Sequence, residues 1–108
     1  MSYLLFLDDR RSPADVRGLP GGRWIVARNR VQFIECIERT GLPVFVSFDY
    51  DLGGLPHGLE CARWLVGYCR DGGEPLPRFN VHSTHLAGAS AIGDLLRGAS
   101  GRAHLDAD

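Results

Sequence analysis

Carboxylates gather at two points of this 108-residue chain, and each pair directly follows a short apolar run. Asp8 and Asp9 follow residues 3–7, and Asp49 and Asp51 follow a run rich in valine and phenylalanine. Such runs are typical of strands that are buried on both faces of a parallel sheet. Open α/β sheets bind their ligands at the carboxyl ends of their strands. The pattern therefore predicts a site at that edge, built on two pairs of aspartates.

Four carboxylates at one edge repel one another, which raises the pKa of some of them unless a cation neutralises the cluster. Oxygen ligands suit Mg²⁺ or Mn²⁺, and added histidine ligands shift the preference toward Mn²⁺, Fe²⁺ or Zn²⁺. We expect a divalent ion, Mg²⁺ or Mn²⁺ ahead of Zn²⁺ or Fe²⁺, to be held by Asp8, Asp9, Asp49 and Asp51. The alternative for each pair is a turn or a helix cap, which aspartates at strand ends often form.

A histidine lies at the end of a further predicted strand, which begins at Arg78. His82 has a side chain that titrates near neutral pH, so it can act as a general acid or base. We expect it to form the catalytic group together with Asp49 and Asp51. The alternative is a core histidine that is hydrogen-bonded to the backbone.

Phosphate is the ligand that the neighbouring residues favour. Arg11 follows the first aspartate pair, and its planar guanidinium can bind a phosphate through two hydrogen bonds. It can instead form an ion pair with Asp8 or Asp49. Ser83 or Thr84 can cap the helix that is predicted to follow them, and the N-terminus of this helix offers free N–H groups and the positive end of the helix dipole. We expect these three residues to bind phosphate: Arg11, Ser83 and Thr84.

Three further residues are possible contacts of the ligand or substrate. Tyr50 lies between two of the aspartates, His57 lies in a glycine-rich loop, and His85 directly follows the hydroxyl residues. His57 can equally be solvated surface. His104, near the end of the chain, is expected to be solvated surface only.

The composition is that of an ordinary soluble globular domain, with 44% hydrophobic and 23% charged residues. A net charge of −1 gives no electrostatic reason to expect nucleic acid or an anionic membrane as a general partner. The chain starts without the basic segment of a signal peptide, and its three cysteines form no C-x-x-C motif. We expect a cytoplasmic protein with reduced cysteines that fill the core.

Hydrophobic periodicity and turn residues predict a single α/β domain over residues 1–108, with a flexible tail over 98–108. Strands are expected over residues 3–7, 24–27, 44–48 and 78–82, and helices over about 30–40, 59–70 and 86–97. Asn29 and Gln32 form a capping-box pattern at the start of the first helix. Right-handed crossovers favour a small flavodoxin-like parallel sheet in the order 2-1-3-4, with helices on both faces.

The order of these residues resembles the receiver domain of response regulators. There, an acidic pair ends the first strand, the phosphoacceptor ends the third and a hydroxyl residue ends the fourth. Receivers that transfer phosphate also use a lysine at the end of a fifth strand. This chain has neither that strand nor any lysine, since all twelve of its basic residues are arginine. Ordinary phosphorelay signalling is therefore disfavoured.

The chain resembles the cyclic-phosphate processing receiver domains more closely. Their D-D-x-R-x-P, F-D-H-D-L and H-S-x-N-P-x-G patterns, together with a glycine and a W-L pair, are matched here by Asp8, Asp9, Arg11, Pro13, Phe48, Asp49, Asp51, Leu52, Gly58, Trp64, Leu65, His82, Ser83 and Gly88. Tyr50 replaces the family's histidine, while His85 and Leu86 replace its asparagine and proline. A histidine lost at 50 and gained at 85 is either a compensating exchange or a sign of an altered ligand.

The resemblance implies processing of cyclic phosphates on nucleotides or RNA ends, so a phosphorylated small molecule or a nucleic-acid end is the expected partner. Our first hypothesis is a metal-dependent phosphoesterase. The second is a pseudo-receiver that binds a metal, nucleotide or protein without chemistry. The third is a phosphoacceptor receiver that is modified on Asp49.

Overall fold

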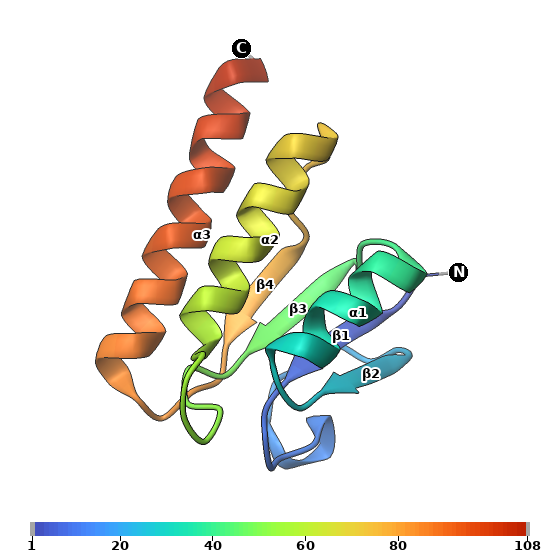
Figure 1. Cartoon of the computed structure of the whole chain (residues 1–108), viewed down its shortest axis with the longest axis vertical. Coiled ribbons are helices and arrows are strands. Elements are labelled where there is room, and N and C mark those ends of the chain that lie inside the picture. The colour runs from blue at the N-terminus through green and yellow to red at the C-terminus, as the bar shows by residue number, and fades with distance from the viewer. Residues whose placement is uncertain (1, 108) are drawn as a thin grey trace.

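The structure is a computed structural model that describes the backbone of residues 2–107 and the side chains of residues 2–100. Its elements follow one another as β1 (Leu4–Leu7), the 3-10 helix η1 (Pro13–Asp15), β2 (Trp24–Ala27), α1 (Arg30–Thr40), β3 (Phe45–Phe48), α2 (Gly58–Gly72), β4 (Arg78–Val81) and α3 (Leu86–Ala107). The four strands form one parallel sheet in the order β2-β1-β3-β4 (Figure 1). The predicted flavodoxin-like fold and strand order are confirmed.

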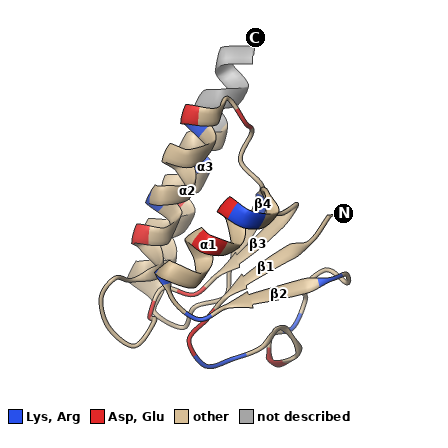
Figure 2. Cartoon of the chain, turned by 45° about the vertical axis from the view of Figure 1, so that its right-hand side comes forward, with Lys and Arg blue, Asp and Glu red and all other residues tan. Residues whose placement is uncertain are grey.

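All three helices lie on one face of the sheet (Figures 1 and 2). α2 packs between α1 and α3, and buried residues of each helix, such as Phe33, Leu65 and Ile92, share one core with Leu5 and Val46. The β2-to-β3 and β3-to-β4 crossovers run in the same direction across the sheet, so right-handed connections place their helices on the same face. The prediction of helices on both faces is wrong, because the β1-to-β2 connection, which runs the other way, contains only the short η1.

Strand alternation sends a second set of side chains to the face without helices. Phe6 is fully buried there, packed edge-on against Trp24, which in turn contacts Phe45 edge-on. The polar residues Ser47 and Asn80 lie in register with Phe6 on the neighbouring strands. This face is therefore apolar toward β2 and polar toward β4, and it carries the polar site described below.

Asn29 begins α1 as expected, because its side-chain oxygen accepts the Gln32 N–H at 2.9 Å. The Gln32 side chain reaches back to the Arg28 N–H at 2.8 Å, one residue before the position that a capping box would use. We expect Asn29→Ala to lower the free energy of unfolding by about 1 kcal/mol, since it leaves a helix N–H without its acceptor. Urea denaturation measures this change, and Asn29→Ser, which keeps an acceptor, should recover most of it.

The last helix is longer than its sequence pattern indicates. α3 continues to Ala107, beyond the expected end at Arg97, because the alanines and leucine that follow Gly98 favour helix and no proline interrupts them. The flexibility expected for residues 98–108 stays a prediction, and His104 lies outside the residues whose side chains are described.

Two of the cysteines fill the core as predicted. Cys61 and Cys69 are buried and Cys36 is half-buried, and none of the three forms a disulfide. Within residues 2–107, no helix has the length and apolar character that crossing a lipid bilayer requires.

Candidate functional site

Strand register brings Asp8, Asp49 and His82 together. The last paired residues of β1, β3 and β4 lie side by side. The residues that follow them, Asp8, Asp49 and His82, therefore form the next row, which lies on the face without helices. The ladder hydrogen bonds extend into this row, from the Asp49 N–H to Leu7 O and from the His82 N–H to Phe48 O. One ligand atom from each of the three side chains lies within 4.8 Å of the other two, a spacing that could hold a metal ion.

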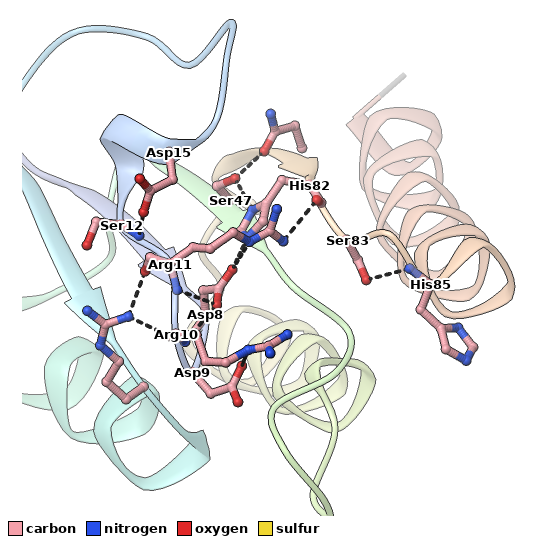
Figure 3. Close-up of polar contacts among 12 residues, drawn as sticks. Asp8, Asp9, Arg10, Arg11, Ser12, Asp15, Ser47, His82, Ser83 and His85 are labelled. Atoms are coloured by element: carbon pink, nitrogen blue, oxygen red, sulfur yellow. Dashed lines mark hydrogen bonds and ion pairs between the residues drawn. The ribbon is translucent and has the colours of Figure 1, made fainter.

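Asp8 is buried, and both of its carboxylate oxygens are occupied (Figure 3). Oδ1 accepts the backbone N–H groups of Arg10 and Arg11 at 2.9 Å each, and Oδ2 accepts Arg11 Nε at 2.9 Å and lies 3.0 Å from His82 Nε2. Burial alone would raise the pKa of Asp8, but these hydrogen bonds outweigh it and hold the pKa at about 2. A carboxylate offers about four acceptor positions. A metal ion could therefore reach Asp8 only after Arg11 or His82 had moved.

His82 belongs to the same buried network, with a side chain that is 2% exposed. Its Nδ1 lies 2.7 Å from the Ser47 hydroxyl, which donates to Asn80 Oδ1 at 2.6 Å, and its ring is stacked on Phe6. Burial lowers the pKa of His82, although the Asp8 carboxylate opposes this shift. Both ring nitrogens have protein partners, so His82 supports Asp8 and is closed to a ligand in this arrangement.

Asp49 is the least compensated carboxylate of the row. It is 6% exposed, and both burial and the negative charge of Asp8 raise its pKa, while the Ser83 hydroxyl, His82 and Arg11 lower it only in part. A buried carboxylate with a raised pKa attracts a proton or another cation.

A cavity of about 430 Å³ opens above this row. It is lined by residues from three strand ends: Arg10, Arg11, Asp49, Asp51, Thr84 and His85. Figure 2 shows the acidic end of β1 passing directly into the basic stretch of the following loop. The cavity thus combines carboxylates, guanidinium groups and a hydroxyl at the edge where the sequence predicts the site.

A model of one protein family, the cyclic-phosphate processing receiver domain, matches residues 3–98. The chain belongs to this family. A search of curated proteins and a search of solved structures each gave no match. The family is associated with cyclic-phosphate processing, and it has a receiver-like fold, as this chain does.

Two predicted metal ligands of this cyclic-phosphate processing receiver domain lie beside the buried row. Oδ1 of Asp9 is buried without a hydrogen-bond partner among residues 2–100, and the nearest cationic atom is Arg10 Nε at 4.0 Å. Asp51 is exposed, and its carboxylate accepts the N–H of Gly53 at 2.9 Å. Asp51 lines the cavity, whereas Asp9 is not among the lining residues.

The three rings singled out in the sequence form one stack. The ring of Tyr50 lies between those of His57 and His85, with centroids 4.7 Å and 4.6 Å away. Positions 50 and 85, where the family pattern exchanges its residues, are therefore in direct contact. Of the three, only His85 lines the cavity.

His85, rather than Ser83 or Thr84, caps α3. Its Nδ1 accepts the Gly88 N–H at 2.9 Å, while its own N–H donates to the Ser83 hydroxyl at 3.1 Å. The predicted cap is thus displaced by one or two residues. An imidazole nitrogen supplies the acceptor that asparagine would supply in a typical cap.

We expect Gly88→Ala to lower the free energy of unfolding by about 1–3 kcal/mol through overpacking. The added Cβ would overlap the ring of Tyr50, which cannot move aside without leaving its two histidine neighbours. Gly93→Ala is the matched control in the same helix, since its Cβ meets only the end of the flexible Arg97 side chain. A loss in Gly88→Ala no larger than in Gly93→Ala would contradict the packing described for Tyr50.

The sequence reasoning missed Ser47, Asn80 and Arg28. Arg28 donates to the backbone oxygens of Asp8 and Arg11 at 3.2 and 2.6 Å, and it thereby holds the loop that follows β1. Ser47 and Asn80 carried a usable signal, because each is a polar residue inside an otherwise apolar strand. Arg28 follows β2 without any such signal.

A hollow of about 630 Å³ lies elsewhere, between α1 and α2. Trp64, Tyr68 and three acidic residues line it. Its carboxylates would repel a phosphate, so it does not compete with the cavity at the sheet edge as a phosphate site.

Proposed function

We propose that this domain is a metal-dependent phosphoesterase that acts on a cyclic phosphate of a nucleotide or an RNA-derived end. One observation carries the proposal: the cavity at the carboxyl edge places two guanidinium groups and a hydroxyl beside two carboxylates. Guanidinium groups and hydroxyls recognise phosphate oxygens, and carboxylates hold the cation that phosphate chemistry uses. Membership of a family associated with cyclic-phosphate processing supports the same substrate class.

The donor set fits a divalent ion such as Mg²⁺ or Mn²⁺, with Zn²⁺ or Fe²⁺ less suited. Asp49 has a raised pKa from burial and the charge of Asp8, and Asp9 has a buried oxygen that lacks a partner in residues 2–100. Asp49 and Asp51, which both line the cavity, would hold the ion. Asp8 would join them if Arg11 released Oδ2, and Asp9 would join them if its side chain turned toward the cavity. The bound ion would supply charge neutralisation at the phosphoryl oxygens and a lower pKa for a water molecule.

The remaining residues bind and position the substrate. Arg11 is the main phosphate-binding cation in the proposal. Its guanidinium would become free for the phosphate on release from Asp8 Oδ2 and from the His82 backbone oxygen, which lies 3.3 Å from its Nη2. Thr84 lines the cavity and offers a hydroxyl donor. The Ser83 hydroxyl lowers the pKa of Asp49 and would thereby help to keep this carboxylate ionised. His82 acts through Asp8, which it orients from within the buried network.

The test is hydrolysis by the purified protein. With Mg²⁺ or Mn²⁺ bound, the protein should open 2′,3′-cyclic nucleotides or an ADP-ribose cyclic phosphate. Chromatography of the products measures this reaction. Metal binding is measured separately by calorimetry. A protein that binds metal but turns over none of these substrates would instead be a binding module, and the phosphoesterase proposal would be wrong.

A further inference from the structure

His85 is an exposed residue with one ring nitrogen that has no partner among residues 2–100, and the fold determines which nitrogen this is. Nδ1 accepts the Gly88 N–H at 2.9 Å, so its lone pair is already used in capping α3. A neutral imidazole carries its hydrogen on the nitrogen that does not accept. The neutral ring of His85 is therefore the tautomer with the hydrogen on Nε2.

The ring of His85 is also held in place. Its face packs against Tyr50 at a centroid distance of 4.6 Å, and the other face of Tyr50 packs against His57. Gly88 lies so close to the Tyr50 ring that the stack has no room to shift toward α3. A donor that is fixed before the ligand binds loses little conformational freedom on binding.

The surroundings of His85 match a phosphate. It lines the same cavity as Arg10, Arg11 and Thr84, all of which can donate hydrogen bonds to phosphate oxygens. Asp49 and Asp51 line it too and would repel the anion unless they bind a cation. His82, the other histidine of the site, is closed by its contacts with Asp8 and Ser47.

We propose that His85 is a substrate-binding residue that donates a hydrogen bond from Nε2–H to a non-bridging oxygen of the phosphoryl group. The same side chain caps α3 through Nδ1, so the start of the helix restrains the ring that carries the donor. Tyr50 is a positioning residue for this ring. The inference rests on the proposed function for the identity of the phosphate-bearing ligand, but phosphate binding by His85 can be measured without any turnover.

The variant His85→Asn separates the two roles. Asparagine is a good N-cap acceptor, so the thermal midpoint should fall only by the contribution of the lost contact with Tyr50, about as much as in His57→Asn. It lacks a donor at the position of Nε2, and the loss of a hydrogen bond to a charged group should weaken binding of inorganic phosphate by about 10- to 100-fold. His57→Asn removes the other ring of the stack and should weaken phosphate binding less.

The experiment is a titration of the full chain with inorganic phosphate, with and without Mg²⁺, followed by ¹⁵N-resolved NMR of the histidine side chains. We expect the Nε2–H signal of His85 to shift with phosphate in the wild type and the affinity to fall in His85→Asn. Equal phosphate affinity in both proteins, or no shift at His85, would overturn the inference. A wild type that binds phosphate through His85 but hydrolyses no cyclic phosphate would overturn the proposed function alone.

Discussion

Replacing Asp8 with alanine is expected to lower the free energy of unfolding by about 3–5 kcal/mol, because it breaks a buried ion pair on one side only. Arg11 Nε, two backbone N–H groups and His82 Nε2 all point at the Asp8 carboxylate. All four groups would lose this acceptor. The His82 side chain is 2% exposed and cannot turn to water, whereas the Arg11 side chain is 35% exposed and can. A domain of this size has a total stability of about 5–15 kcal/mol, so the loss is a large part of it.

Urea denaturation followed by far-ultraviolet circular dichroism measures the effect. Asp9→Ala is the matched control, because the carboxylate of Asp9 is 22% exposed and lies 4.0 Å from the Nε of Arg10. That control should change the stability by less than about 1 kcal/mol. Similar losses in the two variants would show that the hydrogen bonds of Asp8 are not what stabilises the fold.

The low pKa of Asp8 also gives the direction of an acid effect. The pKa falls from an ordinary value of 3.8 to about 2 in the folded protein, so the ionised carboxylate stabilises the fold at every pH above about 4. This contribution, about 2 kcal/mol, is lost as the pH falls from about 4 to about 2. In the Asp8→Ala variant that particular loss should be missing from the acid-denaturation profile.

Asp49→Asn is expected to raise the stability of the fold and to lower the proposed phosphoesterase activity strongly. Burial and the charge of Asp8 raise the pKa of Asp49 in the folded protein. At any pH above the pKa that Asp49 has in the unfolded chain, its ionised form therefore destabilises the metal-free fold. Asparagine has nearly the same shape without the charge, so the thermal midpoint at pH 7 should rise. The same change removes the carboxylate that we propose as the main metal ligand. Metal-ion catalysis contributes several kcal/mol, so turnover should fall by roughly 10²- to 10⁴-fold.

Two readouts distinguish this prediction from simple damage to the fold. Adding Mn²⁺ should raise the thermal midpoint of the wild type but not that of Asp49→Asn, because only a bound ligand stabilises by mass action. Asp51→Asn is the control, since its exposed carboxylate should give no gain in stability and a smaller loss of metal affinity. A less stable Asp49→Asn protein would contradict the reading of Asp49 as an uncompensated buried charge.

The location of the site could be predicted from the sequence because two simple rules determine it. Apolar runs that end in aspartate or histidine predict buried strands, and the strand order places the carboxyl ends of β1, β3 and β4 side by side. The row of Asp8, Asp49 and His82 follows from these rules. The family assignment likewise followed from motifs that span most of the chain.

The bonding within the site could not be predicted in the same way. Arg11 and His82 both contact Asp8, but His82 is 74 residues away in sequence, and no local pattern shows which partner fills which oxygen. A general acid or base role for His82 stays a prediction, but the sequence does not show that the side chain is buried and that both ring nitrogens have partners. The placement of the helices could not be predicted for a topological reason: the β1-to-β2 connection, which runs opposite to the other two crossovers, contains the short η1 in place of a full helix.

The polar row has a consequence for how the strands find their partners. Side chains alternate between the two faces of a sheet, so a slip of one residue in β1, β3 or β4 would move Asp8, Asp49 or His82 under the helices. There it would meet Leu65 and Ile92 in place of hydrogen-bonding groups. An unpaired charge in such surroundings costs several kcal/mol, far more than one lost apolar contact. The residues that we propose for phosphate chemistry would therefore also penalise misaligned sheets, and substituting them should make strand pairing less selective during folding.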